Sequence, residues 1–194
     1  ACDFTSWDSN TWGYRFYLYG EIEVPMRVTL GWCQPCNDLA AVEVLPTAPG
    51  EANLQQRLSA LQVELLEELT DSPPKKRWWQ RRARKSTQQS NLEYEIESAE
   101  KRLAEYQLRR AALSSRTSPA RCLKCASDEC AALPPHEVDY FDMESAPVPT
   151  GFIHPGCGGE LITSCDGTRL SLRLTEKAYD LEGRLLSSTP ARAM

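Results

Sequence analysis

The chain has 194 residues, a net charge of −5 and a hydrophobic share of 41%, which fits one large or two small domains with a modest apolar core. No apolar run is long enough to cross a bilayer, and the segment from Cys2 to Asp8 is polar and aromatic, unlike a secretory signal. We therefore expect a cytoplasmic protein whose eight cysteines are reduced, with disulfides in a secreted protein as the alternative.

The amino-terminal part predicts β structure. Side chains alternate with a period of two from Tyr14 to Tyr19 and again from Val24 to Leu30, as in half-buried strands. Gly20 separates the two runs and favours a hairpin between them. The second run leads directly into Cys33-x-x-Cys36.

Helical periodicity replaces this alternation after the segment from Pro46 to Gly50. Leucines recur at helical spacing from Leu54 to Leu69, and Ser72-Pro73-Pro74 ends that helix because proline lacks the amide proton. From Leu92 to Leu113 the repeat is four and three residues, over three heptads. We therefore predict an antiparallel helical hairpin over 50–116, although the heptads could equally pair two chains in a homodimer.

A basic segment with two tryptophans, at 75–85, forms the tip of this predicted hairpin. It holds seven cations, and the rest of the chain carries −12 once they are set aside from the total of −5. The tip suits a nucleic acid, an anionic membrane surface or an acidic protein partner; a solvated helical turn is the plain alternative. The candidate partner-binding residues are Lys75, Lys76, Arg77, Trp78, Trp79, Arg81, Arg82, Arg84 and Lys85.

Beyond Ser118-Pro119 the chain returns to the period of β structure. Leucines at every second position predict a strand over 169–175. We therefore expect a β region at 1–46, the helical hairpin inserted at 50–116, and a second β region at 119–194 that completes the β domain. The predicted fold class is α+β, with antiparallel β-hairpins and an inserted helical (coiled-coil) hairpin.

The sequence has three pairs of candidate metal ligands on predicted turns, and in each pair two residues separate the ligands. Cys33-x-x-Cys36 precedes the helical segment, whereas Cys122-x-x-Cys125 and His154-x-x-Cys157 follow it. Thiolate and imidazole ligands on tight turns are what a tetrahedral zinc ion requires. The spacing therefore predicts Zn²⁺ as the cofactor.

The segment from Phe152 to Leu161 holds the most specific of these motifs, His-Pro-Gly-Cys-Gly-Gly. It resembles the zinc-ribbon family, in which two knuckles from two β-hairpins supply four ligands. The resemblance covers residues 120–165 and extends less clearly to 26–45. It departs from the family in Ala126, where glycine is common. The resemblance implies one zinc site formed by Cys122, Cys125, His154 and Cys157.

Cys33 and Cys36 then fit two arrangements. In the first, they share one site with the knuckle at 122–125, and the helical hairpin is inserted between the two halves of one ribbon. In the second, they hold a separate ion with the help of another cysteine. The candidates for that role are Cys2, Cys130 and Cys165, of which the last two are also explained as small buried apolar residues. Spacing alone does not decide between the arrangements.

The pentapeptide Trp32-Cys33-Gln34-Pro35-Cys36 is also similar to the active site of thioredoxin. In that family the first cysteine is a nucleophile of low pKa at the start of a helix. The resemblance implies thiol–disulfide exchange by Cys33 and Cys36, and a helix over 37–45. Two further knuckles in the same chain favour metal binding instead.

The sequence shows no hydrolytic constellation. It has two histidines, His136 and His154, and no glycine-rich phosphate loop. We therefore expect a non-catalytic zinc-binding module, such as an adaptor or an immunity-type inhibitor, that presents the helical hairpin to a protein partner. The alternatives are a nucleic-acid-binding regulator that acts through the tip at 75–85 and a thiol–disulfide oxidoreductase that uses Cys33 and Cys36.

Overall fold

The computed structural model of the protein describes residues 2–6, 11–71, 86–134, 147–164 and 175–190. The chain forms two compact units, which we call the β unit (residues 1–45 and 116–194) and the helical unit (residues 46–115). The expected α+β class is confirmed, since two packed helices make up one unit and β sheets the other.

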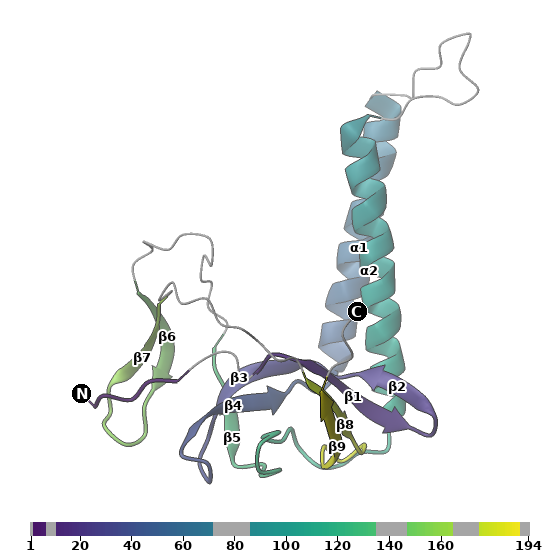
Figure 1. Ribbon diagram of the computed structural model, residues 1–194. Helices are drawn as coiled ribbons and strands as arrows, with labels where there is room; N and C mark the ends of the chain where they lie inside the picture. The colour runs from purple at the N-terminus through teal and green to yellow at the C-terminus, as the bar shows by residue number, and fades with distance from the viewer. Residues whose placement is uncertain (1, 7–10, 72–85, 135–146, 165–174, 191–194) are drawn as a thin grey trace. The chain divides into compact units, whose positions relative to one another are not determined.

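The described strands all belong to the β unit, and Figure 1 shows them in three groups. The strands are β1 Tyr14–Tyr19, β2 Ile22–Pro25, β3 Val28–Cys33, β4 Asp38–Glu43, β5 Cys130–Ala132, β6 Val148–Ile153, β7 Glu160–Thr163, β8 Thr175–Tyr179 and β9 Leu185–Pro190. They form sheets with the orders β2-β1-β8-β9, β4-β3-β5 and β6-β7. Neighbours are antiparallel, except for β1 and β8, which are parallel.

The largest sheet buries aromatic residues where its strands meet. Tyr17 of β1 is in register with Val24 of β2 on one side and with Tyr179 of β8 on the other, and all three are almost fully buried. β-Branched and aromatic side chains pack well on such a pleated surface. This sheet therefore joins the start of the chain to its carboxyl-terminal part.

The alternating run from Val24 to Leu30 is not one strand. It is divided between β2 and β3, which belong to different sheets. At the break, the amide of Met26 donates to the carbonyl of Arg15 (2.9 Å), whereas the amide of Val44 donates to the carbonyl of Arg27 (2.9 Å). The chain thus changes sheets here, and a period-two pattern that continues across the break does not reveal the change.

The β3–β4 hairpin carries the first cysteine knuckle at its tip. β3 pairs with β4 along its whole length, and β5 pairs with the other edge of β3, with Cys130 opposite Cys33. At the outer edge of β4, the amide of Glu43 donates to the carbonyl of Arg121 (3.0 Å). Segments that follow the helical unit in the chain therefore flank this hairpin on both sides.

The helical unit is an antiparallel pair formed by α1 (Ala48–Asp71) and α2 (Thr87–Ala112). The hydroxyl of Tyr106, late in α2, donates to the carbonyl of Thr47 (3.0 Å) just before α1 begins. At the other end of the pair, Ser86 donates to Glu68 (3.0 Å). The start of α1 therefore lies beside the end of α2, and the end of α1 lies beside the start of α2.

Both helices begin with a side-chain cap. α1 starts before the end of the segment from Pro46 to Gly50, after which helical periodicity begins in the sequence. Thr47 Oγ1 accepts the amide of Gly50 (3.1 Å), and Pro49 falls in the first turn, where its missing amide proton is not needed. α2 starts with a capping box. Ser86 Oγ accepts the amide of Gln89 (3.0 Å), and the Gln89 side chain accepts the amide of Ser86 (3.1 Å).

Several predicted features lie outside the described residues. These are the basic tip at 75–85, His136, Cys165 and the strand at 169–175, apart from Thr175 at the start of β8. Within the described part of the chain, neither helix combines the length and apolar character that a membrane span needs.

Candidate metal centres

Four cysteine sulfurs converge at the tip of the β3–β4 hairpin, and we call this group the tetracysteine cluster. Cys33 Sγ lies 3.5 Å from Cys125 Sγ, and Cys36 Sγ lies 4.0 Å from Cys122 Sγ. All four ligand atoms lie within 4.8 Å of one another. Each of these short distances joins the knuckle at 33–36 to the knuckle at 122–125, so the cluster links a segment that precedes the helical unit in the chain to one that follows it.

The second knuckle reaches this position because its flanks pair with the hairpin. Cys122 forms a β-bridge with Val42 of β4, while the amide of Leu123 donates to the carbonyl of Ala41 (2.9 Å). After the knuckle, the carbonyl of Glu129 accepts the amide of Gln34 (3.0 Å), and β5 begins. The backbone therefore brings the two knuckles face to face before any metal is considered.

The three predicted knuckles share one backbone feature. The residue directly after the second ligand has a positive φ in each: 47° at Asn37, 61° at Ala126 and 69° at Gly158. This conformation turns the next amide back towards the ligand, and the amides of Ser127 and Gly159 indeed donate to the preceding cysteine sulfurs. Such amide–sulfur hydrogen bonds stabilise thiolates, and thiolates are the form that binds metal.

The sulfur distances fit a tetrahedral metal site. A disulfide requires about 2.05 Å between sulfurs, which is far shorter than the distances of 3.5 and 4.0 Å observed here. Four thiolates bound to one Zn²⁺ at about 2.3 Å would stand about 3.8 Å apart, which lies between the two observed values. The four cysteines can therefore hold a metal ion without rearranging the strands.

Burial opposes thiolate formation in part of this cluster. It raises the pKa of Cys33 strongly and that of Cys36 to about 11. For Cys125 burial acts in the same direction, but hydrogen bonds from the Ser127 amide and from neighbouring cysteines lower the pKa overall. Four thiolates packed this closely repel one another, so a cation that neutralises them suits the site.

The imidazole of the third knuckle belongs to a separate group, which we call the Cys2 cluster: Cys2, His154 and Cys157. Cys2 Sγ lies 3.2 Å from Cys157 Sγ and 3.8 Å from His154 Nδ1. The structure thus places the four ligands implied by the zinc-ribbon resemblance in two clusters. Cys122 and Cys125 lie with the first knuckle, and His154 and Cys157 lie with the amino-terminal Cys2.

Cys130 belongs to neither cluster of the described residues. Its sulfur lies 3.7 Å from the carbonyl oxygen of Ala120, and its side chain packs beside the buried Cys33 and Cys122. This is the packing of a small apolar residue, which the sequence offered as one explanation for Cys130.

The helix that the thioredoxin resemblance implies over 37–45 is not formed. The chain continues from Cys36 through a turn into β4, so Cys33 lies at the end of a strand and not at the start of a helix. Its pKa is raised by burial, which is the opposite of what activates a nucleophilic thiol. Trp32 of the same motif packs against the ring of His154, with centroids 4.8 Å apart.

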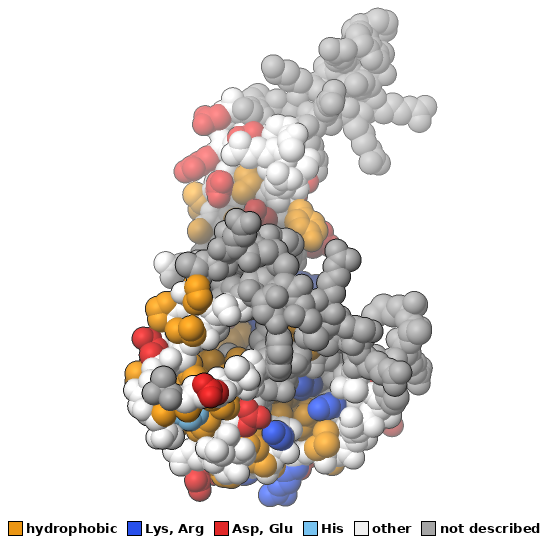
Figure 2. Space-filling view, turned by 60° about the vertical axis from the view of Figure 1, so that its left-hand side comes forward, with side chains coloured by type: hydrophobic (Ala, Val, Ile, Leu, Met, Phe, Trp, Pro, Cys, Tyr) orange, Lys and Arg blue, Asp and Glu red, His pale blue; other side chains and the backbone are white. Residues whose placement is uncertain are grey.

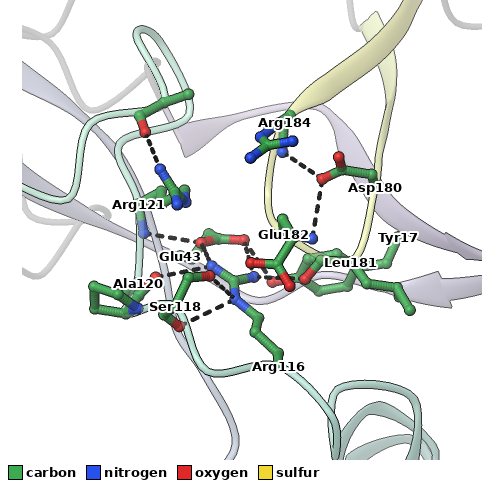
Figure 3. A network of polar contacts seen from close by, with 12 residues as sticks. Tyr17, Glu43, Arg116, Ser118, Ala120, Arg121, Asp180, Leu181, Glu182 and Arg184 are labelled. Atoms are coloured by element: carbon green, nitrogen blue, oxygen red, sulfur yellow. Dashed lines mark hydrogen bonds and ion pairs between the residues drawn. The ribbon is translucent and has the colours of Figure 1, made fainter.

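A buried polar network supports the tetracysteine cluster, and Figure 3 shows it from close by. The side chains of Glu43 and Arg116 are 0% and 2% exposed, and two hydrogen bonds of 2.7 and 2.9 Å join them. Glu43 also accepts from the Tyr17 hydroxyl (2.9 Å) and from the amide of Arg121 (2.8 Å). The Arg121 guanidinium donates to the carbonyl of Ala126 (2.8 Å). A continuous chain of bonds thus runs from β1 to the second knuckle.

Sequence reasoning missed this network because neither Glu43 nor Arg116 lies in a motif. The Arg116 guanidinium also donates to the carbonyls of Leu181 (3.1 Å) and Pro119 (2.9 Å), so it ties the turn between β8 and β9 to the rest of the β unit. The hydrogen bonds and charge of Glu43 raise the pKa of Arg116, and they outweigh burial, which acts to lower it. Only the fold brings these distant residues together.

No family model matches the chain, and neither a curated protein nor a solved structure matches it.

Proposed function

We propose that Zn²⁺ occupies the tetracysteine cluster and has a structural role. The observation that carries this proposal is the near-tetrahedral spacing of the four sulfurs, with distances of 3.5 and 4.0 Å between knuckles. All four ligands come from the protein, which is the pattern of structural rather than catalytic zinc sites. The ion would clamp the two halves of the β unit between which the helical unit is inserted in the chain.

We further propose that the protein is a non-catalytic interaction module, with the helical unit as the contact surface. α1 carries five acidic residues and one arginine, and red acidic side chains are conspicuous on the helices in Figure 2. On the same two helices, Val63, Leu66 and Tyr94 are 54%, 64% and 73% exposed. Exposed apolar side chains on helices that also carry many acidic residues suit a protein partner that offers apolar and basic side chains.

Cobalt substitution tests the metal part of this proposal. Co²⁺ bound to four thiolates gives intense ligand-field bands that report tetrahedral sulfur coordination. We expect these bands in the wild-type protein and their loss, or a shift to weaker three-sulfur bands, in Cys125→Ser, whose side chain is exposed. Cys130→Ala is the matched control and should keep the bands. A wild-type spectrum without four-sulfur bands, or one that Cys125→Ser leaves unchanged, would refute the proposed site.

Capture of partners tests the interaction part. Protein bound to the wild-type chain should be lost with Leu66→Asp or Tyr94→Asp and kept with Glu23→Gln, which is in β2 of the other unit. A captured protein that is indifferent to both hairpin changes would argue against this surface.

A nucleic-acid role is the second candidate, and the cluster of seven cations at 75–85 favours it. Phosphate contacts make such binding strongly dependent on salt. The role predicts salt-dependent binding to single-stranded nucleic acid that disappears when Arg81, Arg82 and Arg84 are changed to alanine. Insulin reduction that depends on Cys33 would instead identify a thiol oxidoreductase.

A further inference from the structure

We propose that the Cys2 cluster is a second zinc site, and that its fourth coordination position is open to an external ligand. Cys2, His154 and Cys157 place their ligand atoms within 4.8 Å of one another. This site shares no ligand with the tetracysteine cluster, so it does not depend on the function proposed above.

The knuckle at 154–157 is built like the knuckle at 122–125. In both, the amide four residues after the first ligand donates to that ligand's carbonyl: Gly158 to His154 (2.9 Å) and Ala126 to Cys122 (2.8 Å). In both, the second ligand is a cysteine, and the amide two residues after it donates to its sulfur. A backbone shape that arranges ligands in one cluster therefore recurs in the other.

The imidazole is held in a suitable tautomer. His154 Nδ1 accepts a hydrogen bond from the amide of Gly156 (3.2 Å), which puts the ring proton on Nε2; a metal ion at Nδ1 would take the lone pair in place of this amide. His154 is 8% exposed, and its ring packs against Trp32 and Phe4, with centroids 4.8 and 5.0 Å away. This packing restricts the ring, as the surroundings of metal-bound histidines usually do.

The same aromatic packing brings Cys2 to the knuckle. Phe4 lies two residues after Cys2 and contacts both Trp32 and His154. Cys2 Sγ then stands 3.2 Å from Cys157 Sγ and 3.8 Å from His154 Nδ1. Zinc bonds of about 2.3 Å to sulfur and about 2.05 Å to nitrogen give a tetrahedral sulfur–nitrogen separation of about 3.6 Å, which the observed sulfur–nitrogen distance approaches. The two sulfurs lie closer together than the about 3.8 Å between thiolates on one zinc ion, so Cys2 or Cys157 would move apart on binding.

The described residues supply three ligands to this site and no fourth. Cys2 and Cys157 are both exposed, whereas the other cluster has two buried cysteines, Cys33 and Cys122, and one exposed cysteine, Cys125. Zinc sites with three protein ligands keep one position for water or another external group. Two thiolates neutralise the charge of the ion, so the position suits a neutral nitrogen donor such as imidazole, or water.

Metal stoichiometry tests whether the second site exists. The reduced protein should bind two zinc ions per chain, as measured by native mass spectrometry and elemental analysis. Cys2→Ser and Cys157→Ser should each lower this to one, and Cys130→Ala should leave it at two. One zinc in the wild-type protein that persists in Cys2→Ser would overturn the proposal, as would a Cys2–Cys157 disulfide in the protein purified under reducing conditions. Cys125→Ser tests the tetracysteine cluster separately, because only that site should then be lost.

Cobalt spectra test the open position. With both sites loaded with Co²⁺, added imidazole should shift the ligand-field bands of the wild-type protein and leave those of Cys2→Ser unchanged. Two bound metals whose spectrum does not respond to imidazole would show that the protein itself completes the coordination. That result would overturn the open position.

Discussion

Trp32 and Cys33 are neighbours in β3, yet their side chains serve different clusters. Cys33 Sγ lies 3.5 Å from Cys125 Sγ in the tetracysteine cluster, whereas the ring of Trp32 lies edge-on to His154, with centroids 4.8 Å apart. Successive residues of a strand point to opposite faces of the sheet, so one strand can support a cluster on each face. β3 is thus the common support of both candidate metal centres.

The ion pair of Glu43 and Arg116 should be essential for the β unit. Both side chains are almost completely buried, so Arg116→Ala leaves a charged carboxylate without its main partner. We expect a loss of about 3–5 kcal/mol in the free energy of unfolding, measured by denaturant titration. The ion pair of Lys124 and Asp38, at 3.4 Å, is the comparison: it is far more exposed to solvent, so Lys124→Ala should destabilise the protein much less. Equal effects of the two substitutions would contradict the importance of the buried network.

Gly183, in the turn between β8 and β9, is required by its surroundings as well as by its backbone. Its φ is 78°, and an added Cβ would stand 2.5 Å from Glu43 Oε1. Gly20 has a similar φ of 63° but nothing within 4 Å of the corresponding Cβ. Gly20→Ala should therefore cost only about 1 kcal/mol of backbone strain, and Gly183→Ala clearly more. Thermal unfolding of the two variants decides this, and a Gly183→Ala protein as stable as Gly20→Ala would disprove the steric argument.

Ala126 is strained in the second knuckle, because its φ of 61° is unfavourable for any residue with a Cβ. Ala126→Gly should relieve this strain and stabilise the protein by about 0.5–1 kcal/mol, with slower loss of metal to a chelator. Ala120→Gly, at a position without positive φ, should be neutral or destabilising because glycine gains more freedom on unfolding. The prediction fails if both changes lower the melting temperature equally.

The cap of α2 should control how often its first turn opens. Ser86→Ala removes the acceptor for the Gln89 amide and the bond to Glu68, at a cost of about 1 kcal/mol. Faster hydrogen exchange of the amides in the first turn of α2 is the expected result. Ser59→Ala, at an exposed position within α1, is the control. It should leave exchange in the first turn of α2 unchanged, because the Ser59 hydroxyl only donates back to the carbonyl of Gln55 (3.0 Å). Unaltered exchange in Ser86→Ala would show that the capping box does not hold the helix start.

Periodicity and ligand spacing revealed much of this arrangement. Both helices and the strand β1 follow from local patterns, and the knuckles follow from ligands spaced two residues apart. Which knuckle meets which is a different matter. It depends on Cys122 pairing with Val42 at the edge of β4, and strand pairing between residues 80 positions apart leaves no mark in the spacing of cysteines. The role of Glu43 was hidden for the same reason.

Ala126 departs from the usual residue type of a zinc knuckle but not from its backbone conformation. Its position after the second cysteine is where glycine is common in knuckles, and the structure indeed gives it a positive φ. The local geometry is therefore kept despite the alanine, at the expense of strain. In contrast, the similarity of residues 32–36 to a redox motif concerned residue types only, and these residues lie at the tip of a β-hairpin and not before a helix.

The most direct test of the central claim is the effect of metal removal on the β unit. Purified, reduced protein should contain zinc, and a strong chelator should abolish the hydrogen-exchange protection of the amides in β3, β4 and 121–123. Structural zinc supplies folding free energy on the order of 10 kcal/mol, so its loss should open this part of the chain. Protein that is isolated without zinc, or that keeps the same exchange protection after chelation, would contradict a metal-held β unit.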